Sequence, residues 1–207
     1  MLTSGLTKAP TAVFHHSARG TGISAVVASS LLRSGLGIDD PVVAKTFAYL
    51  EKNVQKDGGI YDKFLANYTT SVALMTFAEA NTKGKYDSVI KNATQFLRAM
   101  QYDDNRVESG DAKYGGAGYD GKSRPDLSNT QYFLEALQAA GVPKDDPAVK
   151  RALVFVSRCQ NLSGEFNDLA FAKKTTEDDR GGLVYNPLAR TTSATGRLKA
   201  ACARRAP

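Results

Sequence analysis

Three stretches of eleven residues decide the fold: KTFAYLEKNVQ at residues 45–55, KNATQFLRAMQ at residues 91–101 and KRALVFVSRCQ at residues 150–160. Each begins with lysine and ends with glutamine, so they align without gaps at spacings of 46 and 59 residues. Self-similarity on this scale is typical of proteins built from stacked supersecondary units. We therefore interpret the chain as three copies of one unit.

The residues around each stretch predict a helix with a defined start and end. Aspartate supplies an N-cap acceptor, and proline suits the first helical position because the N–H that it lacks would be unpaired there. These start signals are Asp40-Pro41, Asp87-Ser88 and Asp146-Pro147. Each stretch is followed by a glycine pair and then an aromatic residue, at Gly58 to Tyr61, Gly115 to Tyr119 and Gly181 to Tyr185.

A second helix is expected before each stretch, at residues 21–34, 68–80 and 127–139. YTTSVALM at 68–75 aligns with LSNTQYFL at 127–134, and both helices are apolar around most of their circumference. Such helices are buried on all sides, whereas the lysine-to-glutamine helices are amphipathic and half exposed. The sequence thus predicts an all-α protein of repeated helical hairpins in two layers, forming part of an α/α toroid or solenoid. We expect six inner side chains to be buried: Leu74, Met75, Phe77, Phe133, Leu134 and Leu137.

The repeat pattern divides the chain into three parts. We expect an N-terminal arm at residues 1–20, then three hairpins at about 21–61, 66–119 and 125–187. Residues 188–207 carry five basic residues and no acidic one, and they lack any feature of the repeat. We expect this aberrant basic tail to be disordered. An Ala/Arg/Pro run resembles a shifted reading frame, so our hypothesis is a truncated chain whose ancestor continued with further repeats.

Charge and hydropathy narrow the classes of partner. The formal net charge is +6, but the basic tail accounts for five of these charges, so residues 1–187 give no electrostatic footprint for nucleic acid. No apolar stretch reaches the ~20 residues of a membrane-spanning helix, and the amino terminus does not read as a signal peptide. We leave the compartment undetermined, between a cytoplasmic protein and an exported one whose true start is missing. Peripheral membrane contact stays open.

The third unit resembles the QW repeat of squalene and oxidosqualene cyclases. Arg151, Ala152, Phe155, Val156, Gln160 and Gly164 match the motif, and Phe166 stands where the family has tryptophan. The chain contains no tryptophan, so Phe or Tyr must serve as the stacking partner of the glutamine. The resemblance implies a structural role at the carboxyl ends of the outer helices for Gln55, Gln101, Gln160 and Phe166. It covers roughly residues 21–187 and includes the protein prenyltransferases, which share the toroid.

The resemblance also locates the place of the cyclase acid. The family has an Asp-x-Asp-Asp-Thr stretch at the start of an inner helix, and its middle aspartate protonates an alkene. Here the stretch reads Asp126-Leu127-Ser128-Asn129-Thr130. A serine hydroxyl is far too weak an acid for that step, and a lone Asp126 at a helix start is stabilised as the anion. We therefore name no catalytic residue and expect a pocket lined by Tyr68, Asp126, Ser128, Asn129 and Tyr132.

No cofactor or metal is expected. The prenyltransferase zinc site uses Asp, Cys and His, but the only histidines here are His15 and His16, ahead of the first repeat. Cys159 falls in an outer helix, where a small buried residue is the default interpretation, and Cys202 lies in the basic tail. No Asp-Asp-x-x-Asp box for a metal-bound diphosphate is present.

Three functions remain open on the sequence. One is a cyclase-like repeat protein that lacks cyclase activity and binds an apolar isoprenoid-like ligand. Another is a non-catalytic repeat scaffold that works through protein contacts. The last is a fragment of an active enzyme, which would be a terpene cyclase (an isomerase) or a prenyltransferase-like enzyme.

Overall fold

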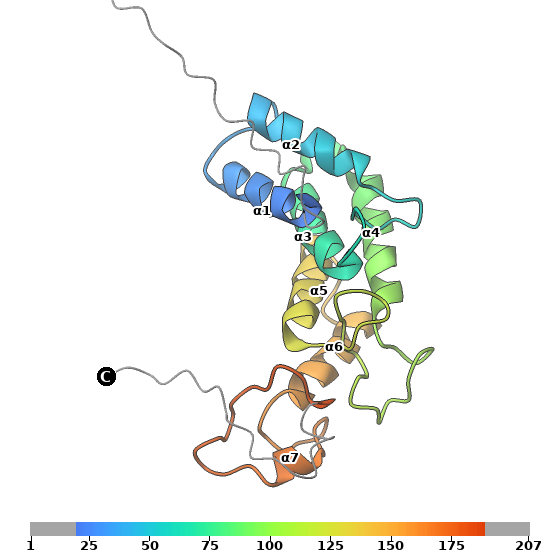
Figure 1. Ribbon diagram of the computed structural model, residues 1–207, viewed down its shortest axis with the longest axis vertical. Coiled ribbons are helices and arrows are strands. Elements are labelled where there is room, and N and C mark those ends of the chain that lie inside the picture. Colours follow the sequence, from blue (N-terminus) through green and yellow to red (C-terminus); the bar gives the residue numbers. More distant parts are fainter. Residues whose placement is uncertain (1–19, 189–207) are drawn as a thin grey trace, which may run out of the picture.

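The computed structural model describes residues 20–188, and regular structure in that range is helical (Figure 1). The helices are α1 (Gly20–Arg33), α2 (Pro41–Lys52), α3 (Ala66–Glu79), α4 (Asp87–Met100), α5 (Leu127–Ala139), α6 (Pro147–Arg158) and the short α7 (Ala170–Lys173), with a 3₁₀ turn at Thr82–Gly84. The all-α prediction is confirmed. Apart from Gly20 and Leu188, the expected arm (1–20) and basic tail (188–207) lie outside the described residues.

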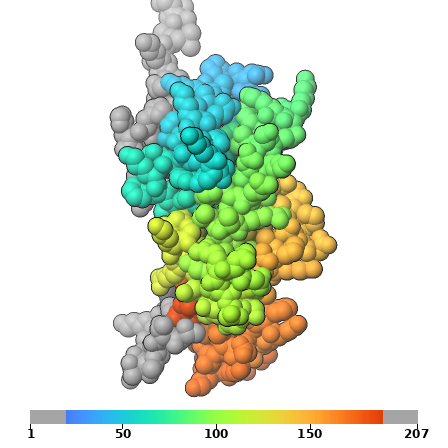
Figure 2. Space-filling view, turned by 90° about the vertical axis from the view of Figure 1, so that its right-hand side faces the viewer, coloured from blue at the N-terminus to red at the C-terminus, as the bar shows by residue number. Residues whose placement is uncertain are grey.

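The helices form three consecutive hairpins along the length of the molecule (Figure 1). Helices α1, α3 and α5 make the inner series, with α3 packed between α1 and α5. Helices α2, α4 and α6 pack against their inner partners to make the outer series. In the space-filling view the first hairpin lies at one end and the third at the other, with α4 and its loop between them (Figure 2).

Two of the three expected N-caps are present. Asp40 Oδ1 accepts hydrogen bonds from the N–H groups of Val42 and Val43, and Asp146 Oδ1 accepts from Ala148 N. The prediction for Asp87 is wrong, because α4 begins one residue earlier than expected. Asp87 is the first residue of the helix, and Tyr86 occupies the N-cap position. The Asp87 carboxylate instead accepts from the Asn81 side chain at 2.7 Å, which fixes the turn before α4.

The core lies between the two layers. Of the six inner side chains predicted to be buried, Leu74, Phe77, Phe133 and Leu137 are fully buried, while Met75 and Leu134 are half-buried. Helix α3 has α1, α4 and α5 around it, so most of its circumference is covered. The expectation that α5 is equally enclosed is wrong, since a polar stripe on its free side is exposed: Gln131, Glu135 and Gln138.

The segments that join the first hairpin to the second and the second to the third each contain a glycine pair. A Cβ on Gly115 would come within 1.8 Å of the Arg151 carbonyl oxygen in α6, and one on Gly58 within 2.7 Å of the Asn92 carbonyl oxygen in α4. Both glycines also have φ near +85°, a region that L-residues avoid (φ +81° and +90°). Both the positive φ and the lack of space for a Cβ therefore require glycine where a loop touches the backbone of the next outer helix.

Candidate functional site

The start of α5 holds the stretch that resembles the cyclase acid motif. Asp126 is the N-cap of α5: its Oδ1 accepts from Asn129 N at 2.9 Å, and its Oδ2 accepts from Asn129 Nδ2 at 2.8 Å. Only 3% of Asp126 is exposed. An aspartate at this position satisfies an amide that the helix leaves free, which is why the sequence folds this way locally. Asp126 and Asn129 thus face each other rather than an open pocket.

Thr130 has a structural task in the same motif. Its hydroxyl donates to the Asp126 carbonyl oxygen at 2.8 Å and accepts from Ala117 N at 3.0 Å. In the preceding hairpin the Thr70 hydroxyl accepts from Ile60 N in the same way, at 2.8 Å. The two threonines are therefore equivalent, and the predicted gapless pairing of Thr70 with Asn129 is wrong by one residue. With this correction Tyr68 is the equivalent of Ser128.

The third glycine-pair loop closes over the back of Asp126. Leu127 N, next to Asp126, donates to the Tyr185 carbonyl oxygen at 2.8 Å. Burial, followed by the influence of the Asp126 carboxylate, raises the pKa of the Tyr185 hydroxyl. Burial also raises the pKa of the Cys159 thiol to about 12, with a further contribution from Asp126. Cys159 is fully buried, in keeping with its interpretation as a small core residue. Within residues 20–188 no lysine or arginine forms an ion pair with Asp126.

A groove of about 740 Å³ opens beside this helix start. One wall is apolar and comes from α1, through Ile23, Val26 and Val27. The other wall is formed by three tyrosines and by Ser128: Tyr68 from α3, Tyr119 from the loop before α5, and Tyr132 from α5. Of the five predicted lining residues, Tyr68, Ser128 and Tyr132 line the groove. Asp126 and Asn129 do not, because they are buried behind it.

The ring of Tyr68 contacts the rings of both Tyr132 and Tyr119. The ring centroids of Tyr68 and Tyr132 are 5.0 Å apart with the ring planes at 89°, and those of Tyr68 and Tyr119 are 6.4 Å apart at 61°. Burial, followed by the neighbouring hydroxyls of Tyr132 and Tyr119, raises the pKa of Tyr68. Sequence reasoning missed Tyr119 and Tyr185 as site residues. The sequence feature that could have identified them is their position, since each is the aromatic residue at the end of a glycine-pair loop.

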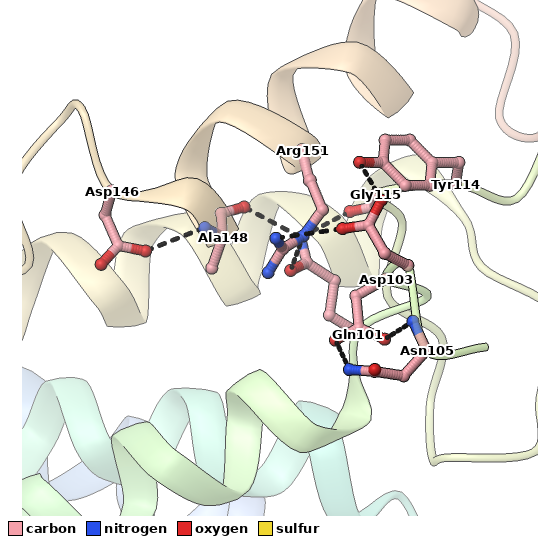
Figure 3. A network of polar contacts seen from close by, with 9 residues as sticks. Gln101, Asp103, Asn105, Tyr114, Gly115, Asp146, Ala148 and Arg151 are labelled. Carbon is pink, nitrogen blue, oxygen red and sulfur yellow. Dashed lines mark hydrogen bonds and ion pairs between the residues drawn. The ribbon is translucent and has the colours of Figure 1, made fainter. Parts of the chain in front are cut away.

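Gln101 is the glutamine that joins two repeats. It is fully buried at the C-cap of α4, and its Nε2 donates to the carbonyl oxygens of Gly115 and Ala148, both at 2.9 Å (Figure 3). Its Oε1 accepts from Arg151 Nε at 3.3 Å. The side chain therefore connects the end of α4, the glycine-pair loop and the first turns of α6. Figure 3 shows Tyr114 beside this contact. The Tyr114 hydroxyl donates to Asp104 Oδ1 at 2.9 Å.

Gln160 occupies the corresponding position in the third repeat with weaker contacts. Its Nε2 donates to the Gly181 carbonyl oxygen at 3.4 Å, which corresponds to the Gln101–Gly115 bond. The residue is only half-buried. Phe166, which replaces the family tryptophan, is 49% exposed, so a buried stack on this ring is not formed. Its carbonyl oxygen accepts from Arg158 Nε.

Gln55 is not equivalent to the other two glutamines. Gln55 N donates to Gly59 O, as Tyr102 N donates to Gly116 O and Asn161 N to Gly182 O. These bonds make Val54, rather than Gln55, the structural equivalent of Gln101. The alignment of the first repeat with the other two therefore shifts by one residue. The same shift brings Tyr49 and Leu50 into line with Phe96 and Leu97. The Gln55 side chain instead bonds within its own loop, to the Tyr61 carbonyl oxygen at 2.6 Å.

Residues 20–188 contain no cluster of three or more His, Cys, Asp or Glu side chains that could hold a metal ion. Across the same range, none of the helices has the length and apolar character that crossing a membrane requires. His15, His16 and Cys202 lie outside the described residues.

Stacked hairpins with a groove at the start of an inner helix define a terpenoid-cyclase type of α-helical repeat protein. The chain belongs to the squalene-hopene cyclase C-terminal domain family, whose model matches residues 12–177. A comparison with curated proteins gave no significant match.

Proposed function

We propose that this chain binds an apolar, isoprenoid-like ligand in the groove beside α5 and does not protonate it. The observation that carries the proposal is Ser128: it lines the groove at the position where the family acid is expected, and it has no acidic proton to give. The one carboxylate that this stretch retains, Asp126, is buried behind the groove.

Asp126 is also a poor substitute for the missing acid. Both oxygens of its carboxylate accept hydrogen bonds from Asn129, one from the main-chain N–H and one from the side-chain amide. These bonds and the burial of the residue keep the carboxylate among the main-chain and side-chain groups of the α5 start, and Asp126 does not line the groove in which an alkene would lie.

The walls of the groove support an apolar ligand. Its volume of about 740 Å³ lies within the usual ~300–1,000 Å³ of small-molecule pockets. Ile23 and Val26 are exposed apolar side chains on the α1 wall, and covering them would remove apolar surface from water. None of the described lining residues is charged.

A non-catalytic interaction scaffold is the second candidate, and one specific surface favours it. Leu183, in the third glycine-pair loop, is 61% exposed, whereas the equivalent residues Ile60 and Ala117 are fully buried by the next hairpin. An exposed apolar surface at the end of a helical repeat is suited to contact with another protein.

Two assays on the purified chain test the proposal. After incubation with squalene, product analysis should detect no cyclised triterpene, and isothermal titration should detect binding of farnesol. Val26→Asp places a charge on the apolar wall and should abolish farnesol binding. Val42→Asp, on a valine of α2 that is also exposed (36%, against 48% for Val26), is the matched control and should leave it unchanged.

Either of two results would overturn the proposal. Cyclised product that disappears in the Asp126→Asn variant would show that Asp126 acts as the acid after all. Farnesol binding that is absent, or that is unaffected by Val26→Asp, would remove the groove from consideration and leave the scaffold.

A further inference from the structure

The contact between successive hairpins is made twice inside the chain in the same way. The first glycine of each loop lies against a carbonyl oxygen of the next outer helix, and the second lies against an aromatic ring of that helix, Phe96 or Phe155. The N–H group of the residue after the pair donates to a threonine hydroxyl of the next inner helix. These bonds are Ile60 N to Thr70 Oγ1 at 2.8 Å and Ala117 N to Thr130 Oγ1 at 3.0 Å. Three contacts therefore define one type of interface.

The third loop presents the same groups with no described helix against them. Gly181 has a φ of +78°, in the same region as the first glycines of the other two loops. In the described part of the chain, the N–H group of Leu183 has no hydrogen-bond acceptor, and the Leu183 side chain is exposed. Gln160 Nε2 donates there to Gly181 O alone, whereas Gln101 also donates to Ala148 O of the next outer helix. We call the surface of Gln160, Gly181 and Leu183 the tail.

The first hairpin presents the matching groups at the other end of the molecule (Figure 2). Ser24 is the fifth residue of α1 and Thr70 the fifth of α3, so Ser24 is equivalent to the threonine acceptors of the two internal interfaces. Its hydroxyl is buried and has no hydrogen-bond partner among the described residues, which costs free energy. Val42, like Ala148, follows the proline that starts an outer helix, yet Val42 is 36% exposed and Ala148 only 2%. We call Ser24 and Val42 the head.

The inner helices at the two ends are also matched in charge. In the contact between α1 and α3, the Ser29 hydroxyl donates to Glu79, the last residue of α3, at 2.7 Å. Counted from the hydroxyl residue of each inner helix, Glu135 of α5 is equivalent to Ser29, and Arg33, the last residue of α1, is equivalent to Glu79. The Arg33 side chain is exposed although its Nε pairs with Glu79, and Glu135 is exposed too. A copy stacked on the tail would therefore bring an arginine to a glutamate.

We infer that copies of this chain associate head to tail, with the third loop of one copy on the first hairpin of the next. Leu183 N then donates to the Ser24 hydroxyl, and Gln160 Nε2 donates to the Val42 carbonyl oxygen. The occupant is a second copy because the contact repeats an interface that the chain already makes twice, and because the donor and the acceptor lie at opposite ends. Such a contact joins two different surfaces, so it can continue beyond two copies. The inference does not depend on the proposed ligand.

Sedimentation velocity of the full chain over a concentration series tests the association. The parent chain should form dimers and larger assemblies as the concentration rises. Leu183→Asp and Val42→Asp should each weaken association at least about tenfold, because the equivalent positions are buried in the internal interfaces. Both side chains are exposed in a single copy, so both variants should fold. Phe64→Asp is the matched control and should associate like the parent, since Phe64 is as exposed as Leu183 (60% and 61%) and lies between the first loop and α3.

An equimolar mixture of the two blocked variants distinguishes a head-to-tail contact from a contact between like ends. Leu183→Asp keeps an intact head and Val42→Asp an intact tail, so the mixture should form one-to-one dimers and nothing larger. A parent chain that stays monomeric at every concentration would overturn the inference, and so would association that Leu183→Asp leaves intact. Failure of the mixture to associate, or a block by only one of the two variants, would also contradict it.

Discussion

The second and third glycine-pair loops share their sequence pattern but not their surroundings. In the loop from Gly115 to Tyr119, the first glycine lies against the α6 backbone and the residue after the pair, Ala117, is fully buried. In the loop from Gly181 to Tyr185, no described residue other than the two chain neighbours has an atom within 4 Å of where a Cβ on Gly181 would be. The residue after the pair, Leu183, is 61% exposed. The loops nevertheless make the same main-chain bonds, Gly115 N to Tyr102 O and Gly181 N to Asn161 O.

The difference shows that two features of this motif have separate causes, namely its backbone conformation and its close approach to the next outer helix. The backbone conformation of the loop arises within its own repeat, because it forms even where no described helix packs against it. The close approach that excludes every residue but glycine arises from the following hairpin. The third loop still has a role, since Val184 N donates to Cys159 O at 2.7 Å and Tyr185 covers Asp126.

The largest expected effect comes from alanine at the two glycines. Gly115→Ala places a methyl group 1.8 Å from the Arg151 carbonyl oxygen, so α6 must move, and we expect a loss of at least about 3 kcal/mol in the free energy of unfolding. Gly181→Ala has the same positive φ but open space around it, so only the conformational cost of about 1–2 kcal/mol remains. Urea denaturation followed by circular dichroism measures both, and equal losses would remove the distinction between the two loops.

Alanine at the two glutamines should cost less than Gly115→Ala, and the second repeat should again be the more sensitive one. Gln101→Ala leaves two carbonyl oxygens without a buried donor and opens a cavity, which should cost about 2–3 kcal/mol. Gln160→Ala removes one long bond at a half-exposed site and should cost no more than about 0.5 kcal/mol. Urea midpoints of the two variants against the parent chain report this, and a larger loss for Gln160→Ala would contradict the assignment of Gln101 as the joint.

A pH-dependent effect concerns Cys159, whose carbonyl oxygen accepts from Val184 N of the third loop. The pKa of Cys159 is about 12 in the folded chain against an ordinary value of 9.0, so at pH 10 the thiol ionises in the unfolded state only. The unfolded chain then binds fewer protons than the folded one, and stability falls as the pH rises above 9. We expect Cys159→Ala to recover about 1 kcal/mol between pH 7 and pH 10, relative to the parent chain. Parallel loss in both proteins would mean that the third loop does not keep water from Cys159.

Sequence patterns predicted the order of helices and their two layers correctly, because hydrophobic periodicity over twelve or more residues outweighs local exceptions. They did not predict the alignment of the first repeat with the other two correctly. The predicted alignment relied on two polar residues, Lys45 and Gln55. In the structure Val54 is equivalent to Gln101, and Leu50 is equivalent to Leu97. Tyr49 and Leu50, each one position early, carried the correct signal.

The site was predicted in part for a related reason. Residues 126–130 were recognisable as a helix start, but which side chains face the groove depends on contacts with residues far along the chain. Asn129 turns toward Asp126, and Asp126 is covered by Tyr185, 59 residues later. Tyr119 enters the groove because the second loop is tied to Asn67 and Thr130 of the neighbouring inner helices. No local pattern contains that information.

Amide hydrogen exchange with and without farnesol tests the central claim most directly, because it distinguishes a groove that binds a ligand from an exposed loop that binds a partner. The account predicts slower exchange in the presence of farnesol at residues 22–27, 66–69 and 128–132, which surround the groove, and unchanged exchange at residues 181–185. Protection confined to residues 181–185, or no protection at any of these segments at saturating farnesol, would contradict it.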